Sequence, residues 1–197
     1  RGEFGPYFEQ RVDIRTGRLT GFEMLARWDA PAHRHVPVET FIDVAQEAGL
    51  IGDLSISIME KAFLEAKNWD PSLTIAVNIS PVQLLDERLA QRILKLLVET
   101  GFPPQRLEAE ITEGALFKIV ELAQTIIHTP KTQGIRVGYA DFGTGYSALA
   151  YLARLPHHRI KLDKTFVQDL GNPATAELIR AIIARIGPLT GPGAVYA

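Results

Sequence analysis

From Leu73 onward, short apolar runs rich in β-branched residues alternate with longer stretches of helical periodicity. Strands are predicted over 73–79, 106–111, 135–140 and 159–162. Helices are predicted over 86–100, 113–128, 146–154, 164–170 and 175–186. Strands that alternate with helices along a chain usually pair in a mostly parallel sheet. The fold class is therefore predicted to be α/β.

The N-terminal part has a different pattern. Two β-rich runs, 7–14 and 19–28, flank a short turn that contains Gly17, and this predicts a hairpin. A helix is expected over 38–49, and Asp53 is expected to cap a second helix that ends near residue 68. Residues 1–5 resemble a cloning remnant and are left outside the fold, so a single domain over 6–197 is predicted.

Polar residues lie where the predicted parallel strands end: Asn78, Glu110, Asp141 and Lys161. In open α/β sheets and in (β/α) barrels, this edge holds the active site. Glu23 lies between apolar neighbours in an earlier strand, where a charged side chain is seldom left without a partner. Carboxylate and amide oxygens suit a hard divalent cation such as Mg²⁺ or Mn²⁺ better than zinc. Lys161 could orient a water molecule or neutralise a phosphate oxygen.

Each of these residues also has a simpler interpretation when it is taken alone. Glu23 is typical of an edge-strand surface residue, and Glu113 fits the first turn of a helix, where the dipole favours acids. Asn78 is a plausible turn former before a proline. The loop 143–145 is a weak phosphate signal by itself. The joint placement of these residues at one sheet edge is what favours a functional site.

Composition excludes several classes of function. The chain has 197 residues, of which 46% are hydrophobic, and its net charge is −2. A weakly acidic chain without a basic stripe is not expected to bind DNA or RNA. The sequence has no cysteine, which excludes disulfides and thiolate metal sites. No apolar run approaches the roughly 20 residues that a transmembrane helix needs. A soluble cytoplasmic domain is expected.

Five segments, in this order, resemble motifs of the EAL domain family, the cyclic di-GMP phosphodiesterases. Residues 21–28 resemble the signature segment, with Met24 where the family has alanine. The other four resemble its NxSxxQL, ExTE, DFGTGYS and KxD stretches, at 78–84, 110–113, 141–147 and 160–163. The resemblance implies a TIM-like (β/α) barrel with an antiparallel first strand, and hydrolysis of cyclic di-GMP to linear pGpG.

The resemblance also implies roles for individual residues. The implied metal ligands, for Mg or Mn and possibly two ions, are Glu23, Asn78, Glu110 and Asp141. Lys161 would hold the attacking water, and Glu113 would steady the loop after Asp141. The implied ligand contacts are Arg27, which suits a phosphate, together with Leu25 and Asp163. Family members usually adjoin sensory or cyclase domains and form homodimers, so both kinds of partner are expected.

Three departures from the family pattern stand out. Ala140 replaces the first of two adjacent aspartates, which in the family reaches both metal ions, and a methyl group cannot coordinate a cation. Glu9 stands where many members have a glutamine that contacts the ligand. After Ile186 the expected glutamate-bearing strand is missing, so six strands are predicted and the barrel is expected to be incomplete at its C-terminus. A truncated chain or an omitted segment near Ile186 would account for this.

Three functions are therefore open from the sequence. The first is a cyclic di-GMP-binding domain whose hydrolysis is impaired by Ala140. The second is an active phosphodiesterase in which Ala140 is engineered or tolerated. The third is a module that does not bind the nucleotide and acts through a protein partner, which Glu9 and the missing segment favour.

Overall fold

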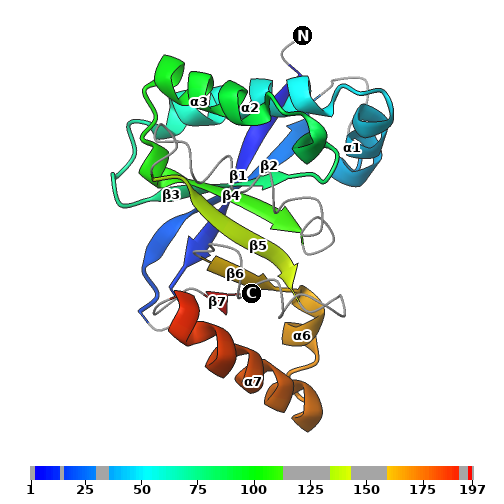
Figure 1. Cartoon of the computed structure of the whole chain (residues 1–197), viewed down its shortest axis with the longest axis vertical. Coiled ribbons are helices and arrows are strands. Elements are labelled where there is room, and N and C mark those ends of the chain that lie inside the picture. Colours follow the sequence, from blue (N-terminus) through cyan, green and yellow to red (C-terminus); the bar gives the residue numbers. More distant parts are fainter. Residues whose placement is uncertain are drawn as a thin grey trace.

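A curved sheet with the strand order β1 to β7 carries the described part of the chain (Figure 1). The computed structural model describes residues 3–13, 16–29, 36–112, 134–142, 159–190 and 195–196. The strands are β1 (Phe4–Val12), β2 (Leu19–Trp28), β3 (Thr74–Ile79), β4 (Leu107–Thr112), β5 (Arg136–Phe142), β6 (Arg159–Leu162) and β7 (Val195–Tyr196). The α-helices are α1 (Val38–Glu47), α2 (Ile51–Ala66), α3 (Leu89–Thr100), α6 (Lys164–Gln168) and α7 (Pro173–Thr190), with short 3₁₀ turns at Gln83–Leu85 and Pro104–Arg106.

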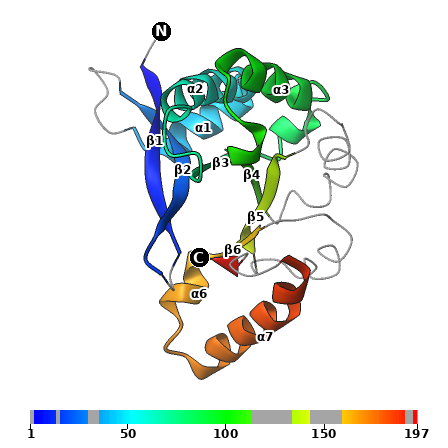
Figure 2. The same cartoon turned by 90° about the vertical axis from the view of Figure 1, so that its left-hand side faces the viewer.

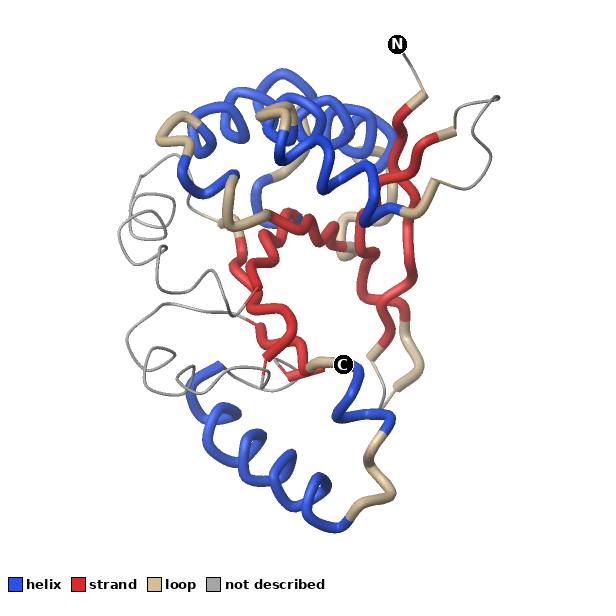
Figure 3. The backbone as a smooth tube through the Cα atoms, turned by 90° about the vertical axis from the view of Figure 1, so that its right-hand side faces the viewer, coloured by secondary structure: helices blue, strands red, loops and turns tan. Residues whose placement is uncertain are grey.

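The strand directions confirm the predicted topology. β1 pairs antiparallel with β2, and each later strand pairs parallel with the one before it. The strands curl into an arc, with β1 and β7 at its two ends (Figure 3). Helices α1, α2 and α3 lie outside one part of the arc, and α6 and α7 lie by another (Figure 2). This is an incomplete TIM-like barrel with an antiparallel first strand.

The first strand starts earlier than the sequence predicted. Phe4 and Gly5, which the sequence alone places outside the fold, pair with Trp28 and Arg27 in the sheet. The Phe4 ring stacks on Trp28 at 5.2 Å between centroids and lies 5.4 Å from Phe41 of α1. These aromatic contacts fix the start of β1 in a position that strand periodicity alone does not reveal.

The start of α2 also differs from the prediction. Leu50 is the N-cap residue, and Asp53 lies inside the first turn. The expectation that Asp53 caps this helix is wrong, because burial of Ile51 extends the helix further toward its N-terminus. Asp53 instead accepts a hydrogen bond of 2.6 Å from Arg92 of α3.

The C-terminal part is longer than expected. Helix α7 continues beyond Ile186 to Thr190, and β7 adds a seventh strand beside β6, where the sequence predicted six. Ile160 pairs with Val195 and Lys161 with Tyr196 in this added strand. The predicted helices over 113–128 and 146–154 lie outside the described residues.

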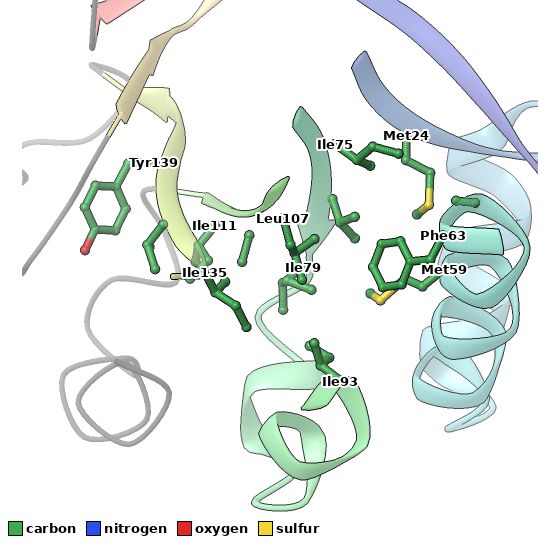
Figure 4. Packing of buried hydrophobic residues seen from close by; sticks show 14 of the residues in the cluster. Met24, Met59, Phe63, Ile75, Ile79, Ile93, Leu107, Ile111, Ile135 and Tyr139 are labelled. Atoms are coloured by element: carbon green, nitrogen blue, oxygen red, sulfur yellow. The ribbon is translucent and has the colours of Figure 1, made fainter. Parts of the chain in front are cut away.

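The apolar core fills the space between the sheet and its covering helices (Figure 4). Phe63 of α2 stacks on Phe102 at 4.7 Å, and both rings are buried. Ile75 and Ile79 of β3 contribute to this core. Side chains alternate between the two faces of a strand, so the residue between Val77 and Ile79 must face the other way. The core thus determines which residues of each strand line the inner, concave face.

Among the described residues, no helix is long and apolar enough to cross a membrane.

Candidate functional site

Charged and polar side chains gather on the concave face of the sheet, opposite the apolar core. Glu23, Asn78, Glu110 and Lys161 come from β2, β3, β4 and β6 and are linked by contacts between side chains. The register places Asn78 beside Glu110 in neighbouring parallel strands. The structure therefore brings together four of the residues selected from the sequence.

Glu23 lies at the centre of this group. Its Oε1 accepts a hydrogen bond of 2.8 Å from Asn78 Nδ2, and its Oε2 accepts one of 2.6 Å from Lys161 Nζ. β2 lies between β1 and β3, so interpreting Glu23 as an edge-strand surface residue is wrong. Asn78 lies within β3, rather than in the turn that its sequence context suggested, and is exposed. The hydrogen-bonded pair of Glu23 and Asn78 therefore lies where the cluster reaches solvent.

The contacts of Glu23 and Lys161 change the acidity of both groups. Burial alone would raise the pKa of Glu23, but the hydrogen bonds from Lys161 and Asn78 outweigh it and lower this pKa below its ordinary value. Burial alone would lower the pKa of Lys161, but the hydrogen bond to Glu23 and the charge of Glu110 raise it overall. Both groups are therefore charged at neutral pH. A charged ammonium cannot act as a general base, but it can orient a water molecule.

Arg11 belongs to the cluster, and sequence reasoning missed it. Its Nη1 lies 3.1 Å from Glu110 Oε1, and its Nη2 lies 3.2 Å from Glu108 Oε1. Both glutamate side chains are 0% exposed. One sequence signal could have found it. Residues two apart in a strand share a face, so Arg11 lies on the same face of β1 as Glu9, which the sequence already linked to the ligand. The curvature that brings this face across to β4 is a property of the whole sheet.

The other predicted ligand contacts lie around the cluster. Arg27 is in β2, four residues beyond Glu23 on the same face, and its guanidinium carbon lies 5.7 Å from the centre of the Tyr7 ring. Leu25 lies between Glu23 and Arg27 on that face and pairs with Tyr7 in the register. A guanidinium held against an aromatic ring is well placed to bind a phosphate with a fixed orientation.

Asp163 has a structural task at the start of α6. Its carboxylate caps this helix by accepting hydrogen bonds from the backbone nitrogen and the hydroxyl of Thr165. These hydrogen bonds lower the pKa of Asp163. Its predicted ligand contact stays a prediction. Glu113 lies outside the described residues, and the backbone of Asp141 lies in β5 without a described side chain.

The oxygen donors in this cluster are of the type that a hard divalent cation prefers. Glu23 and Glu110 supply carboxylate oxygens, and an amide that donates to Glu23 through Nδ2 would coordinate through Oδ1. Within the described residues, no group of three or more acidic or histidine side chains is placed to hold a metal ion. Ala140 is buried and shares the concave face with Gly138, where it presents only a methyl group. That position cannot contribute a ligand for a second ion.

An apolar crevice lies on the opposite, helix-covered face of the sheet. Its lining within the described residues comes from α3, β3, β4, the 3₁₀ turn Gln83–Leu85 and the residue just before β5, and includes Ile79, Ile93, Leu107 and Ile135. It contains none of the charged residues above, so the carboxylate cluster is the better candidate for a functional site.

Comparisons with known proteins agree with this geometry. The model of the EAL domain matches residues 1–189. The chain is 37% identical over 182 residues to the cyclic di-GMP phosphodiesterase PdeR of Escherichia coli, covering 90% of the chain and 27% of that relative. It is 38% identical to an uncharacterised protein of Sinorhizobium fredii, covering 97% of the chain and 23% of the relative. The chain thus spans about a quarter of the length of these relatives.

Solved structures show the same fold. The MucR phosphodiesterase of Pseudomonas aeruginosa in complex with cyclic di-GMP superposes with a TM-score of 0.86 at 28% identity, covering 95% of this chain and 78% of that one. The FimX EAL domain of the same organism, bound to cyclic di-GMP, superposes with a TM-score of 0.84 at 23% identity, covering 95% and 76%.

Proposed function

Because this chain belongs to the EAL domain family, we propose that it recognises cyclic di-GMP at the carboxyl-terminal mouth of its strands and hydrolyses it poorly. The observation that carries the proposal is the convergence of Glu23, Asn78, Glu110 and Lys161, with Ala140 on the same face. The convergent residues supply a binding site for a polar ligand. Ala140 removes a charge from that site.

Recognition of the nucleotide is assigned to the C-terminal end of β2. Arg27 would contact a ligand phosphate through its planar guanidinium, with Tyr7 holding the guanidinium in position. Leu25 would offer an apolar surface beside Arg27. Asp163, which lies between β6 and α6, would contact the ligand from the β6 side of the mouth. The structure of MucR in complex with cyclic di-GMP supports this ligand class, since that domain has the same fold.

Hydrolysis would depend on the carboxylate cluster itself. Glu23, Asn78, Glu110 and Asp141 would hold one divalent cation, Mg²⁺ or Mn²⁺, which when bound would polarise the phosphodiester and acidify a water molecule. Lys161, held by Glu23, would orient that water beside the phosphate. Glu113 would steady the chain after Asp141. Without a carboxylate at position 140, the site has fewer ligands for cations and less power to stabilise the transition state.

Restoring the missing acid tests this proposal. We expect the wild-type chain with Mg²⁺ or Mn²⁺ to turn over cyclic di-GMP far below an ordinary rate of about 10 s⁻¹. Ala140→Asp should raise the rate at least about tenfold, which corresponds to roughly 1.4 kcal/mol of activation free energy. The rate of pGpG formation, followed by chromatography, measures both.

The matched control is Ala140→Asn, which has nearly the same shape as the aspartate but no charge, and which should give little of the gain. Thermal melting of all three proteins checks that the buried substitution leaves the fold intact. A wild-type rate near 10 s⁻¹ would contradict the impairment and favour an active phosphodiesterase.

The relatives support a setting of this domain in a larger protein. This chain spans 23% of the Sinorhizobium relative and 27% of MucR, and MucR is named as a bifunctional diguanylate cyclase and cyclic di-GMP phosphodiesterase. We therefore expect neighbouring sensory or cyclase domains in the full protein. Homodimer formation and a cytoplasmic location stay predictions.

A further inference from the structure

Alternating charges continue from the mouth of the site into the barrel interior. Lys161 Nζ lies 2.6 Å from Glu23 Oε2 and 3.8 Å from Glu110 Oε2. The other oxygen of Glu110 lies 3.1 Å from Arg11 Nη1, and Arg11 Nη2 lies 3.2 Å from Glu108. Two protein cations thus alternate with three carboxylates along one continuous network.

The inner part of this network, from Glu110 to Glu108, is well shielded from water. The side chains of Glu108 and Glu110 are 0% exposed, and that of Arg11 is 10% exposed. Two carboxylates on one face of one strand repel each other strongly at low dielectric, so a positive charge in contact with both is favourable. In a metal-dependent site a divalent cation can supply that charge. Here the guanidinium of Arg11 contacts both carboxylates with separate nitrogens.

We propose that Arg11 is a built-in counter-ion of the inner carboxylates, which holds Glu108 and Glu110 in place without a divalent cation and weakens divalent-cation binding at Glu110. A cation that approaches Glu110 is repelled by the guanidinium already in contact with that side chain. It also competes with Arg11 for the Glu110 oxygens. The effect acts on Glu110, a proposed metal ligand, through a residue that cannot itself bind a metal ion.

A purely structural ion pair would have a different signature. Loss of Arg11 would then lower stability and would leave Mn²⁺ affinity unchanged or weaker. A counter-ion predicts the opposite sign for metal binding, because removal of one positive charge about 3 Å from Glu110 reduces the repulsion of an approaching metal ion. Mn²⁺ affinity, measured without any nucleotide, therefore separates the two roles. This test does not depend on cyclic di-GMP binding or hydrolysis.

The experiment compares Mn²⁺ binding by the wild-type chain, Arg11→Gln and Arg11→Met, using electron paramagnetic resonance of free Mn²⁺. Both variants should bind Mn²⁺ at least about tenfold more tightly than wild type. Mn²⁺ should also raise their melting temperatures more than it raises that of wild type. Arg11→Gln keeps amide donors for the carboxylates, so it carries the test if Arg11→Met does not fold. A variant that folds only with Mn²⁺ present also supports the proposal.

Two controls define the result. Arg11→Lys keeps the charge and should bind Mn²⁺ like wild type. Arg88→Met removes an arginine whose side chain is 84% exposed, and should also match wild type. Equal or weaker Mn²⁺ binding by Arg11→Gln, or no Mn²⁺ binding by either this variant or wild type, overturns the proposal.

Discussion

Gly138 makes room for the paired carboxylates of β4. A Cβ atom at this position would lie 3.1 Å from Glu108 Oε1 and 3.4 Å from the Cγ atom of Glu110. These neighbours have little freedom to move, because Arg11 holds both carboxylates. The absence of a side chain in β5 is therefore part of the construction of the site.

Gly138→Ala should lower the free energy of unfolding by about 1–3 kcal/mol, because the added methyl group crowds a buried and tethered pair. Urea denaturation measures the change. The matched control is Gly5→Ala, also in a strand, where an added Cβ meets no atom within 4 Å. An equal effect at the two glycines would show that crowding of the carboxylates is not the cause.

The ion pair of Glu23 and Lys161 gives stability a defined dependence on pH. The lowered pKa of Glu23 contributes stability that is present above its ordinary value of 4.5 and is lost as the pH falls through the lowered value. The raised pKa of Lys161 contributes stability that is present below its ordinary value of 10.5 and is lost as the pH rises through the raised value. Between these limits the contribution is constant.

Glu23→Gln should therefore lose less stability than wild type when the pH is lowered from 7 to about 3, because it has no carboxylate to protonate at this position. Unfolding by urea at a series of pH values gives the comparison. Parallel loss of stability in the two proteins over this range would mean that the pair does not stabilise the fold.

Sequence reasoning placed Glu23, Asn78, Glu110 and Lys161 correctly in one region, because parallel strands deliver their ends to the same edge. It did not find Arg11, since a charged residue in a strand rich in charged residues is typical of a solvent-facing position. Only the closing curvature of the sheet brings β1 near β4. Contacts across a barrel between distant strands do not follow from local periodicity.

At the scale of elements, one arginine joins α2 to the sheet. Arg106 is buried, and it donates hydrogen bonds to the carbonyl oxygens of Leu73 at 2.8 Å and Ala66 at 3.0 Å. Its guanidinium carbon also lies 4.9 Å from the centre of the Phe102 ring. Burial lowers the pKa of Arg106, but an arginine remains charged at any physiological pH. The side chain thus satisfies carbonyl groups at the end of α2 and before β3.

Arg106→Met should lower the free energy of unfolding by about 2–4 kcal/mol, because it leaves these buried carbonyl groups without their donors. Guanidinium chloride denaturation measures this change. Arg88→Met, which alters an exposed arginine, should change stability by less than about 0.5 kcal/mol. A similarly small effect at Arg106 would contradict its role in joining α2 to β3.

The elements themselves were predicted unevenly. β2 and β6 have the predicted bounds, because apolar residues alternate with polar or charged ones in parts of both segments, which is a clear strand signal. The start of β1 and the whole of β7 were missed. Phe4 is held by aromatic partners in β2 and α1, and the two-residue β7 forms only because β6 offers a free edge beside it.

At the scale of the whole molecule, the chain supplies a TIM-like sheet that is lined on its concave face by carboxylates and cations. The family and the parallel topology could be predicted from five motifs and from the alternation of strands and helices. The pairing of arginine and lysine with glutamates inside the sheet could not be predicted, because it depends on how far the sheet curls. This pairing determines whether the domain needs a metal ion to keep its site in order.

Recognition of cyclic di-GMP without rapid hydrolysis is the property on which the proposed function depends, and calorimetric titration with Mg²⁺ present measures it. We predict saturable heat for the wild-type chain, with the nucleotide recovered intact afterwards. Arg27→Ala should bind about 10- to 100-fold more weakly, since it loses a charged hydrogen-bond donor to phosphate. No heat from wild type at millimolar nucleotide, or complete conversion to pGpG during the titration, would contradict the proposed function.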